Sequence, residues 1–261
     1  MNDASAWTAF DWTILGPALV AGVLVLATHV PLGIQVLDRG IVFIDLAIAQ
    51  IAGLGVIAAG ALGFGDAGVV VQVSAIVAAL AGAAALSWTE RRAGAHQEAL
   101  IGVAFVVAAC VGILVLAHNP HGGEHLREML VGQVLWVGTP QLVGAAAVTL
   151  VVLAALRFGW AARMGRFGFY AVFALAVTSS VQLVGVYLVF ASLIVPALGS
   201  LSRAGDRRLP TAYAIGLIGY LAGLVASAML DLPTGAVIVC TLVIAALSVA
   251  MVPASGSRRA R

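Results

Sequence analysis

The stretch IVFIDLAIAQIAG, residues 41–53, decides the fold. Eleven of its thirteen residues are apolar or glycine, and the other two are Asp45 and Gln50. With the apolar residues that follow it, the run is long enough for a helix to cross a bilayer core of about 30 Å. A carboxylate at the centre of such a helix costs roughly 2.5–3.5 kcal/mol on insertion scales. We therefore expect a membrane helix here, and a partner or a function for Asp45.

The composition of the whole chain agrees with a membrane protein. The 261 residues are 62% hydrophobic and 9% charged, with a mean hydropathy of +1.12, whereas soluble domains are about 25% charged. All thirteen basic residues are arginine. A Walker A phosphate loop needs its lysine, so this chain cannot hydrolyse ATP by that route. Cys110 and Cys240 lie in apolar runs, which predicts buried small residues rather than a disulfide.

Hydrophobic segments follow one another along the chain without a linker between them. The residues 168–201 form either one bent span or two short ones, so the sequence predicts eight or nine membrane segments. The segments are roughly 14–36, 41–62, 69–88, 99–118, 141–157, 168–183, 185–201, 210–230 and 233–253.

The arginines orient these segments, because positively charged loops stay in the cytoplasm. Nine segments with the N-terminus outside place twelve of the thirteen arginines inside and only Arg127 outside. A single crossing by 168–201 would instead put Arg203, Arg207 and Arg208 outside. A tight outer turn at 182–185 would join the two halves, and either half could be a partial span or a re-entrant helix. We also expect Pro196 to break the helix near the inner face. The predicted fold is an all-α polytopic membrane protein with about eight or nine membrane segments, one of them broken or re-entrant.

The candidate site residues are His29, Asp45 and Gln50, which are polar side chains within the apolar spans. The short turn at 38–40 makes the first two segments neighbours, so His29 and Asp45 could face each other at similar depth. An imidazole and a carboxylate form a plausible transient ligand set for a divalent transition metal. Gln50 lies about 140° round the helix from Asp45, so both border one cavity only if it is wide. The alternative is a His–Asp hydrogen bond that only fixes packing.

Two further polar stretches stand out. In HNPHGGEHLREM, residues 118–129, His118 precedes His121 and His125, and the last two share a face if the stretch is helical. This stretch is either a solvated loop helix or a weak site that captures a cation on the outer side. In TSSVQ, residues 178–182, the polar side chains begin a segment that could line a substrate path.

Four stretches together resemble the membrane permease subunits of bacterial zinc and manganese ABC importers. They are PLGIQVLDRGIVFIDLAIAQIAGLGV (31–56), HQEALIGVAFVVAACVGILVL (96–116), VGVYLVFASLIVPALGS (184–200) and DLPTGAVIV (231–239). The resemblance implies one transmembrane permease domain over 1–261, in the bacterial cytoplasmic (inner) membrane. It implies a transport subunit rather than an enzyme, with no permanently bound cofactor and a divalent metal ion, zinc or manganese, as cargo. The partners it implies are a second permease copy, a cytoplasmic ATPase subunit and an extracytoplasmic metal-binding protein, and no nucleic acid.

The second segment departs from the family pattern. Members of this family usually carry Gly-Asp followed by a histidine four residues after the acid. Aligned on PLG and GLGV, this chain has Asp45 at the glycine position, Leu46 at the acid position and Gln50 at the histidine position. Our hypothesis is that His29 with Asp45 replaces the usual pair, with Gln50 lining the same passage. The loop 157–167 is shorter than the usual coupling segment and lacks its acid, so 202–209 could share the docking of the ATPase.

Two rival functions stay open. An ABC permease for a metal chelate, such as a siderophore or cobalamin, has a similar plan but is usually longer. An ion-coupled secondary transporter would use His29 and Asp45 as a proton relay and would work without an ATPase. Zinc favours imidazole and manganese accepts more oxygen ligands, so a mixed set leaves the metal open.

Overall fold

In the computed structural model, the residues described are 12–64, 68–117, 130–132, 134–203 and 205–251. Within these ranges every regular element is a helix. An apolar chain takes this form because a helix satisfies its own backbone hydrogen bonds where no water is available. The predicted all-α membrane fold is confirmed.

Nine helices of at least 14 residues occur in the described part of the chain. They are α2 (Trp12–Arg39), α3 (Ile44–Ala59), α4 (Gly68–Ala93), α5 (Gln97–Leu116), α7 (Thr139–Arg157), α9 (Gly165–Val184), α10 (Val186–Gly199), α11 (Arg208–Leu230) and α12 (Thr234–Met251). Shorter elements are the π-helical turn η1 (Gly60–Phe64), α8 (Trp160–Arg163) and the 3-10 turns η2 (Gly94–His96), η3 (Val134–Trp136) and η4 (Gly205–Arg207).

Helix length alone does not fix the number of crossings. Seven stretches among the described residues are long and apolar enough to span a membrane, and one of them, 68–116, contains both α4 and α5. These two helices form a hairpin, because Gln97 Nε2 at the start of α5 donates to Leu86 O near the end of α4 at 3.0 Å. The helix α10 has only 14 residues, fewer than the about 20 that a full span needs. The count of eight or nine stays a prediction.

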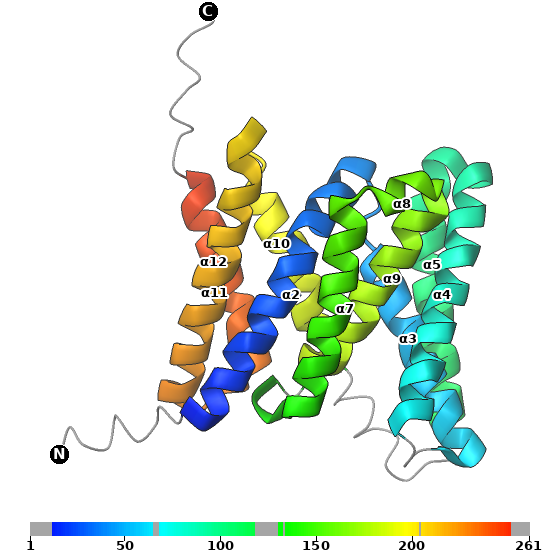
Figure 1. Cartoon of the computed structure of the whole chain (residues 1–261), viewed down its shortest axis with the longest axis horizontal. Coiled ribbons are helices and arrows are strands. Elements are labelled where there is room, and N and C mark those ends of the chain that lie inside the picture. The colour runs from blue at the N-terminus through cyan, green and yellow to red at the C-terminus, as the bar shows by residue number, and fades with distance from the viewer. Residues whose placement is uncertain (1–11, 65–67, 118–129, 133, 204, 252–261) are drawn as a thin grey trace, which may run out of the picture.

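The helices α9 and α10 form the two arms of a V (Figure 1). They meet at Gly185, whose φ of 81° favours glycine. A Cβ on Gly185 would lie 2.6 Å from the carbonyl carbon of Val131, so the loop before η3 presses against this turn. The break therefore falls where the sequence predicts an outer turn. The predicted break at Pro196 is wrong, because α10 continues past it to Gly199. Membrane helices tolerate an internal proline when neighbouring groups satisfy the backbone carbonyl that it leaves without a hydrogen bond.

One end of the bundle gathers the arginines that lie within the described residues. The Arg39 guanidinium lies 3.8 Å from the Phe169 ring centroid, and Arg166 Nε lies 3.9 Å from Glu90 Oε2. These contacts join the end of α2, the start of α9 and the end of α4. The ends of α7 and α10 lie at this same upper end of the view in Figure 1. The positive-inside rule predicts that this end faces the cytoplasm.

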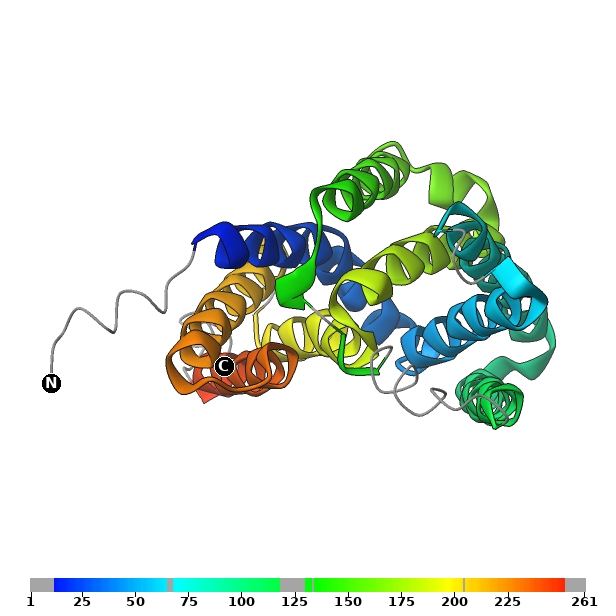
Figure 2. The ribbon, with the colours of Figure 1, turned by 90° about the horizontal axis from the view of Figure 1, so that it is seen from below.

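Seen end-on, the bundle is elongated, with α7 at one long edge and α12, α10, α3 and α5 along the other (Figure 2). Small residues allow the closest helix contacts. A Cβ on Gly219 would lie 2.8 Å from Leu242 Cα, and the close approach lets Thr241 Oγ1 donate to Gly219 O at 2.7 Å. The expectation that the cysteines are buried is wrong: Cys110 and Cys240 are free and exposed. In lipid, a small apolar side chain gains nothing by burial.

Candidate functional site

His29 is a fully buried histidine in the middle of α2. Its Nδ1 lies 3.0 Å from Val25 O and 3.0 Å from Thr28 Oγ1. A carbonyl oxygen only accepts, so Nδ1 donates to Val25, and in a neutral ring Nε2 then carries a lone pair. Nε2 has no hydrogen-bond partner among the described residues. This nitrogen can therefore accept a hydrogen bond or bind a metal ion.

Asp45 lies in the first turn of α3 and is also fully buried. In the described part of the chain, neither of its carboxyl oxygens has a hydrogen-bond partner. His29 lies ten residues before the end of α2, which is about 15 Å along the helix axis. Asp45 lies in the first turn of α3, which begins beside that end of α2. Nothing within the described ranges joins the two side chains by a hydrogen bond or ion pair. The expected similar depth and the alternative His–Asp hydrogen bond are therefore wrong, and only a shared role in metal transport stays a prediction.

Gln50 faces a groove of about 710 Å³ between α3, α5, α10 and α12. Leu46, one turn earlier, lines the same groove because residues four apart share a helix face. Asp45 does not line it. The groove is mostly apolar, and the other lining residues whose side chains carry a heteroatom are Tyr187 and Cys240. The two positions that usually carry the acid and the histidine thus face the groove, while the acid of this chain points elsewhere.

A second cavity of about 320 Å³ lies between α3, α4 and α9, near η3 and the start of α7. Thr178, Gln182 and Gln141 contribute its polar side chains. Thr178 is buried, and its hydroxyl has no partner among the residues that the structure describes. The polar stretch TSSVQ was the sequence signal for this cavity, but Gln141 gave no signal of its own.

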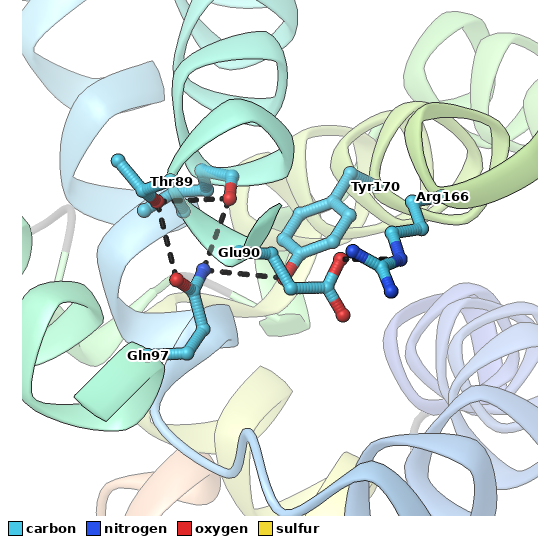
Figure 3. A network of polar contacts seen from close by, with 6 residues as sticks. Thr89, Glu90, Gln97, Arg166 and Tyr170 are labelled. Carbon is cyan, nitrogen blue, oxygen red and sulfur yellow. Dashed lines mark hydrogen bonds and ion pairs between the residues drawn. The ribbon is translucent and has the colours of Figure 1, made fainter. Parts of the chain in front are cut away.

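A polar network ties the α4–α5 hairpin to α9 at the arginine-rich end (Figure 3). Gln97 Nε2 donates to Tyr170 Oη at 3.3 Å, and Thr89 Oγ1 donates to Gln97 Oε1 at 3.2 Å. The Arg166–Glu90 ion pair lies beside it. Sequence reasoning missed this network, because Gln97 and Tyr170 are 73 residues apart and each is unremarkable alone.

Within the described ranges, no three His, Cys, Asp or Glu side chains lie close enough to hold a metal ion. The histidines of the predicted outer capture site, His118, His121 and His125, lie outside the described residues. Among the described residues, His29, Asp45 and Gln50 therefore do not form a closed metal site, and their role as metal ligands stays a prediction.

A family model described as the ABC 3 transport family matches residues 11–164 and 159–253. The chain belongs to the ABC 3 transport family. The resemblance drawn from its four sequence stretches is thereby confirmed at the level of the family. Its apolar helices and its family make it a multi-pass protein of the inner membrane with a role in transport.

The curated relatives of this ABC 3 transport protein have low sequence identity to it, but the alignments cover most of the chain. The chain is 24% identical over 260 residues to the high-affinity zinc uptake system membrane protein ZnuB of Haemophilus influenzae, with 90% of this chain and 96% of the relative covered. It is 25% identical over 251 residues to the manganese transport system membrane protein MntC of Halalkalibacterium halodurans, covering 88% and 84%. A probable iron transport system membrane protein of Haemophilus influenzae is 24% identical over 193 residues, covering 66% and 71%.

A solved structure has the same fold. The chain superposes on PsaBC from Streptococcus pneumoniae in complex with Fab with a TM-score of 0.73. The match covers 92% of each chain at 20% sequence identity. At this identity, the similarity shows the fold of the ABC 3 transport protein and nothing about its cargo.

Proposed function

We propose that this chain is the membrane permease subunit of an ABC importer that carries a divalent transition metal, zinc or manganese, across the inner membrane. The family match over nearly the whole chain carries the proposal. Relatives named for zinc and manganese transport support the class of cargo. The chain is one permease domain over 1–261 and holds metal only in transit.

Energy comes from a separate cytoplasmic ATPase subunit. The chain has no lysine, and a Walker A loop needs one to bind phosphates. The arginine-rich end carries the surface on which the ATPase docks, and both 157–167 and 202–209 lie there. An extracytoplasmic metal-binding protein delivers the ion to the opposite end.

A second copy of the chain closes the passage. The groove that holds Gln50 runs along the long edge formed by α12, α10, α3 and α5 (Figure 2). It presents large apolar side chains such as Phe105 and Phe190. Two copies that pack these edges together bury apolar surface and place Gln50 from each on a shared route.

Along this route, ligands must be weak enough to release the ion. Gln50 offers one amide oxygen, and His29 Nε2 and the two carboxyl oxygens of Asp45 have no hydrogen-bond partner in the part of the chain that the structure describes. Single groups that replace part of the hydration shell allow entry and exit, whereas a closed four-ligand site would hold the metal. His29 and Asp45 reach the passage only when the helices rearrange during the transport cycle.

Reconstitution tests this function. Full-length permease is placed in proteoliposomes with its cognate ATPase and binding protein, and uptake of zinc, manganese and iron(II) is measured with and without ATP. We expect ATP-dependent uptake of zinc or manganese that requires all three components. Uptake driven by a proton gradient through the permease alone would instead establish a secondary transporter. Uptake only of a chelated metal would establish the siderophore-type permease.

A further inference from the structure

The groove between α3, α5, α10 and α12 carries a free thiol. Cys240 of α12 lines the groove and is exposed. The other cysteine, Cys110 of α5, is also free and exposed, but it does not line the groove. A free cysteine behaves as a small apolar residue in many proteins, so exposure alone indicates no site. The groups that share the groove with Cys240 decide whether its thiol has a function.

Gln50 is a polar side chain that is buried and turned into the same groove. It is only 9% exposed, and within the described ranges its amide makes no hydrogen bond. A buried polar group without a partner costs about 1–3 kcal/mol. The missing contact points to a ligand in the groove, and an amide oxygen is a neutral ligand for a cation.

The lining of the groove explains why a cation needs the thiol. Among the described residues, those that line it include no acidic side chain and no histidine. A dication that crosses so apolar a surface needs groups that replace part of its hydration shell. Of the lining side chains, Cys240 gives up a proton more readily than the phenol of Tyr187 does. Its thiolate supplies negative charge that the amide of Gln50 lacks.

The helices set the order of the two groups along the route. Cys240 lies six residues after the start of α12, about 9 Å along the axis from the end predicted to face outward. Gln50 lies six residues after the start of α3, which begins at the arginine-rich end. Since α10 lies between α3 and α12 (Figure 2), the two groups project from opposite walls. An ion that enters from outside meets Cys240 first and Gln50 second.

We propose that Cys240 is a metal contact on the transport route and that its thiolate makes the permease favour zinc over manganese. The inference rests on the proposed function and names its cargo. The Cys240 thiol loses its proton to water as the sulfur–zinc bond forms, and it takes a proton back from water when zinc moves on to Gln50. Thiolate is a soft ligand that suits zinc, whereas manganese prefers oxygen.

Uptake by the whole transporter tests the proposal. The permease is reconstituted with its ATPase and binding protein, and maximal rates are compared at saturating metal-loaded binding protein, because that protein itself sets the KM. The wild type should carry zinc faster than manganese. Cys240→Ser should lower the maximal zinc rate roughly tenfold and change the manganese rate little, because a hydroxyl is a harder ligand. The matched control, Cys110→Ser, should behave as the wild type.

Protection of the thiol gives a readout that does not depend on transport. In the Cys110→Ser transporter, zinc should slow the reaction of Cys240 with a water-soluble maleimide roughly tenfold, and manganese should slow it little. Cys110, measured in Cys240→Ser, should react at the same rate with either metal or none. Thermal unfolding of both variants identifies a folding defect.

Three results would overturn the inference while the importer itself stands. They are equal zinc rates in the two serine variants, a wild type that carries manganese faster than zinc, and a Cys240 thiol that zinc does not protect or the reagent does not reach. A wild-type transporter that carries neither metal with ATP would overturn the proposed function, and this inference with it.

Discussion

At the scale of single residues, the burial of His29 and Asp45 is the feature that most needs a physical explanation. Both are fully buried, and each leaves side-chain atoms without a hydrogen bond among the described residues. Buried polar groups without partners are rare, since each costs about 1–3 kcal/mol. Sequence reasoning found both, because an ionisable side chain inside an apolar run is conspicuous. It placed them wrongly relative to each other, because His29 lies ten residues before the end of α2 and Asp45 lies in the first turn of α3.

Loss of His29 or Asp45 is expected to slow transport more than it alters folding. His29→Ala and Asp45→Asn should each lower ATP-dependent zinc or manganese uptake at least tenfold in reconstituted vesicles. The thermal midpoint of Asp45→Asn should stay equal to or above that of the wild type, because a neutral amide replaces an unpaired buried carboxyl group. His29→Ala should lower it modestly, because a buried ring is lost together with its bond to Val25 O. His96→Ala, which removes an exposed histidine at the α4–α5 turn, is the control. Wild-type uptake by both variants would remove these residues from the route.

At the scale of elements, one turn and one hydrogen-bond network fix how neighbouring helices are arranged. The turn at Gly185 fixes the angle between α9 and α10, and the Gln97 network fixes the α4–α5 hairpin against α9. The sequence predicts the first of these, because two crossings by 168–201 need an outer turn to return Arg203, Arg207 and Arg208 to the cytoplasm. It does not predict the second, because a hydrogen bond across 73 residues depends on how whole helices pack.

Gly185→Ala should destabilise the protein. An alanine at φ 81° is strained, at about 1–3 kcal/mol, and its Cβ would also meet the backbone of Val131 and Gly132. Thermal unfolding in detergent measures the loss. Gly102→Ala is the matched control, because this glycine of α5 has open space around a Cβ and alanine favours a helix. A variant at Gly185 as stable as the control variant would contradict the packing described here.

Gln97→Leu should cost about 1–3 kcal/mol of stability, because it leaves Tyr170 Oη and Thr89 Oγ1 with fewer partners at a buried site. Denaturant or thermal unfolding in detergent gives the measurement. Gln72→Leu is the comparison, since Gln72 in α4 is half-buried and no hydrogen bond is recorded for it. Equal stability of the two variants would show that the network contributes nothing.

At the scale of the whole molecule, charge and shape divide the protein into functional surfaces. The arginines mark the cytoplasmic end, and the groove with Gln50 marks one long edge. The arrangement of charge was predictable, because arginine counts in loops are a property of the chain. The groove was not, since it forms from four helices that come from separate parts of the sequence.

Association through this groove should be detectable by cross-linking. In a Cys110→Ser/Cys240→Ser background, Tyr187→Cys places one thiol in the groove. A homobifunctional maleimide added to membranes should yield a dimer band. Leu150→Cys, an exposed position on α7 at the other long edge, should yield little. Equal yields from the two positions, or none from Tyr187→Cys, would argue against the groove as the contact between copies.

The sequence by itself indicated an all-α membrane protein and its family, and it predicted the orientation, because hydropathy and charge add up along the chain and motifs are local. Only the tertiary structure decided that Leu46 and Gln50 face the groove while Asp45 does not, and that Cys110 and Cys240 are exposed. The reason is physical: a helix that is apolar on every side carries no stripe to indicate its inner face. In lipid its rotation is set by close packing and hydrogen bonds with its neighbours.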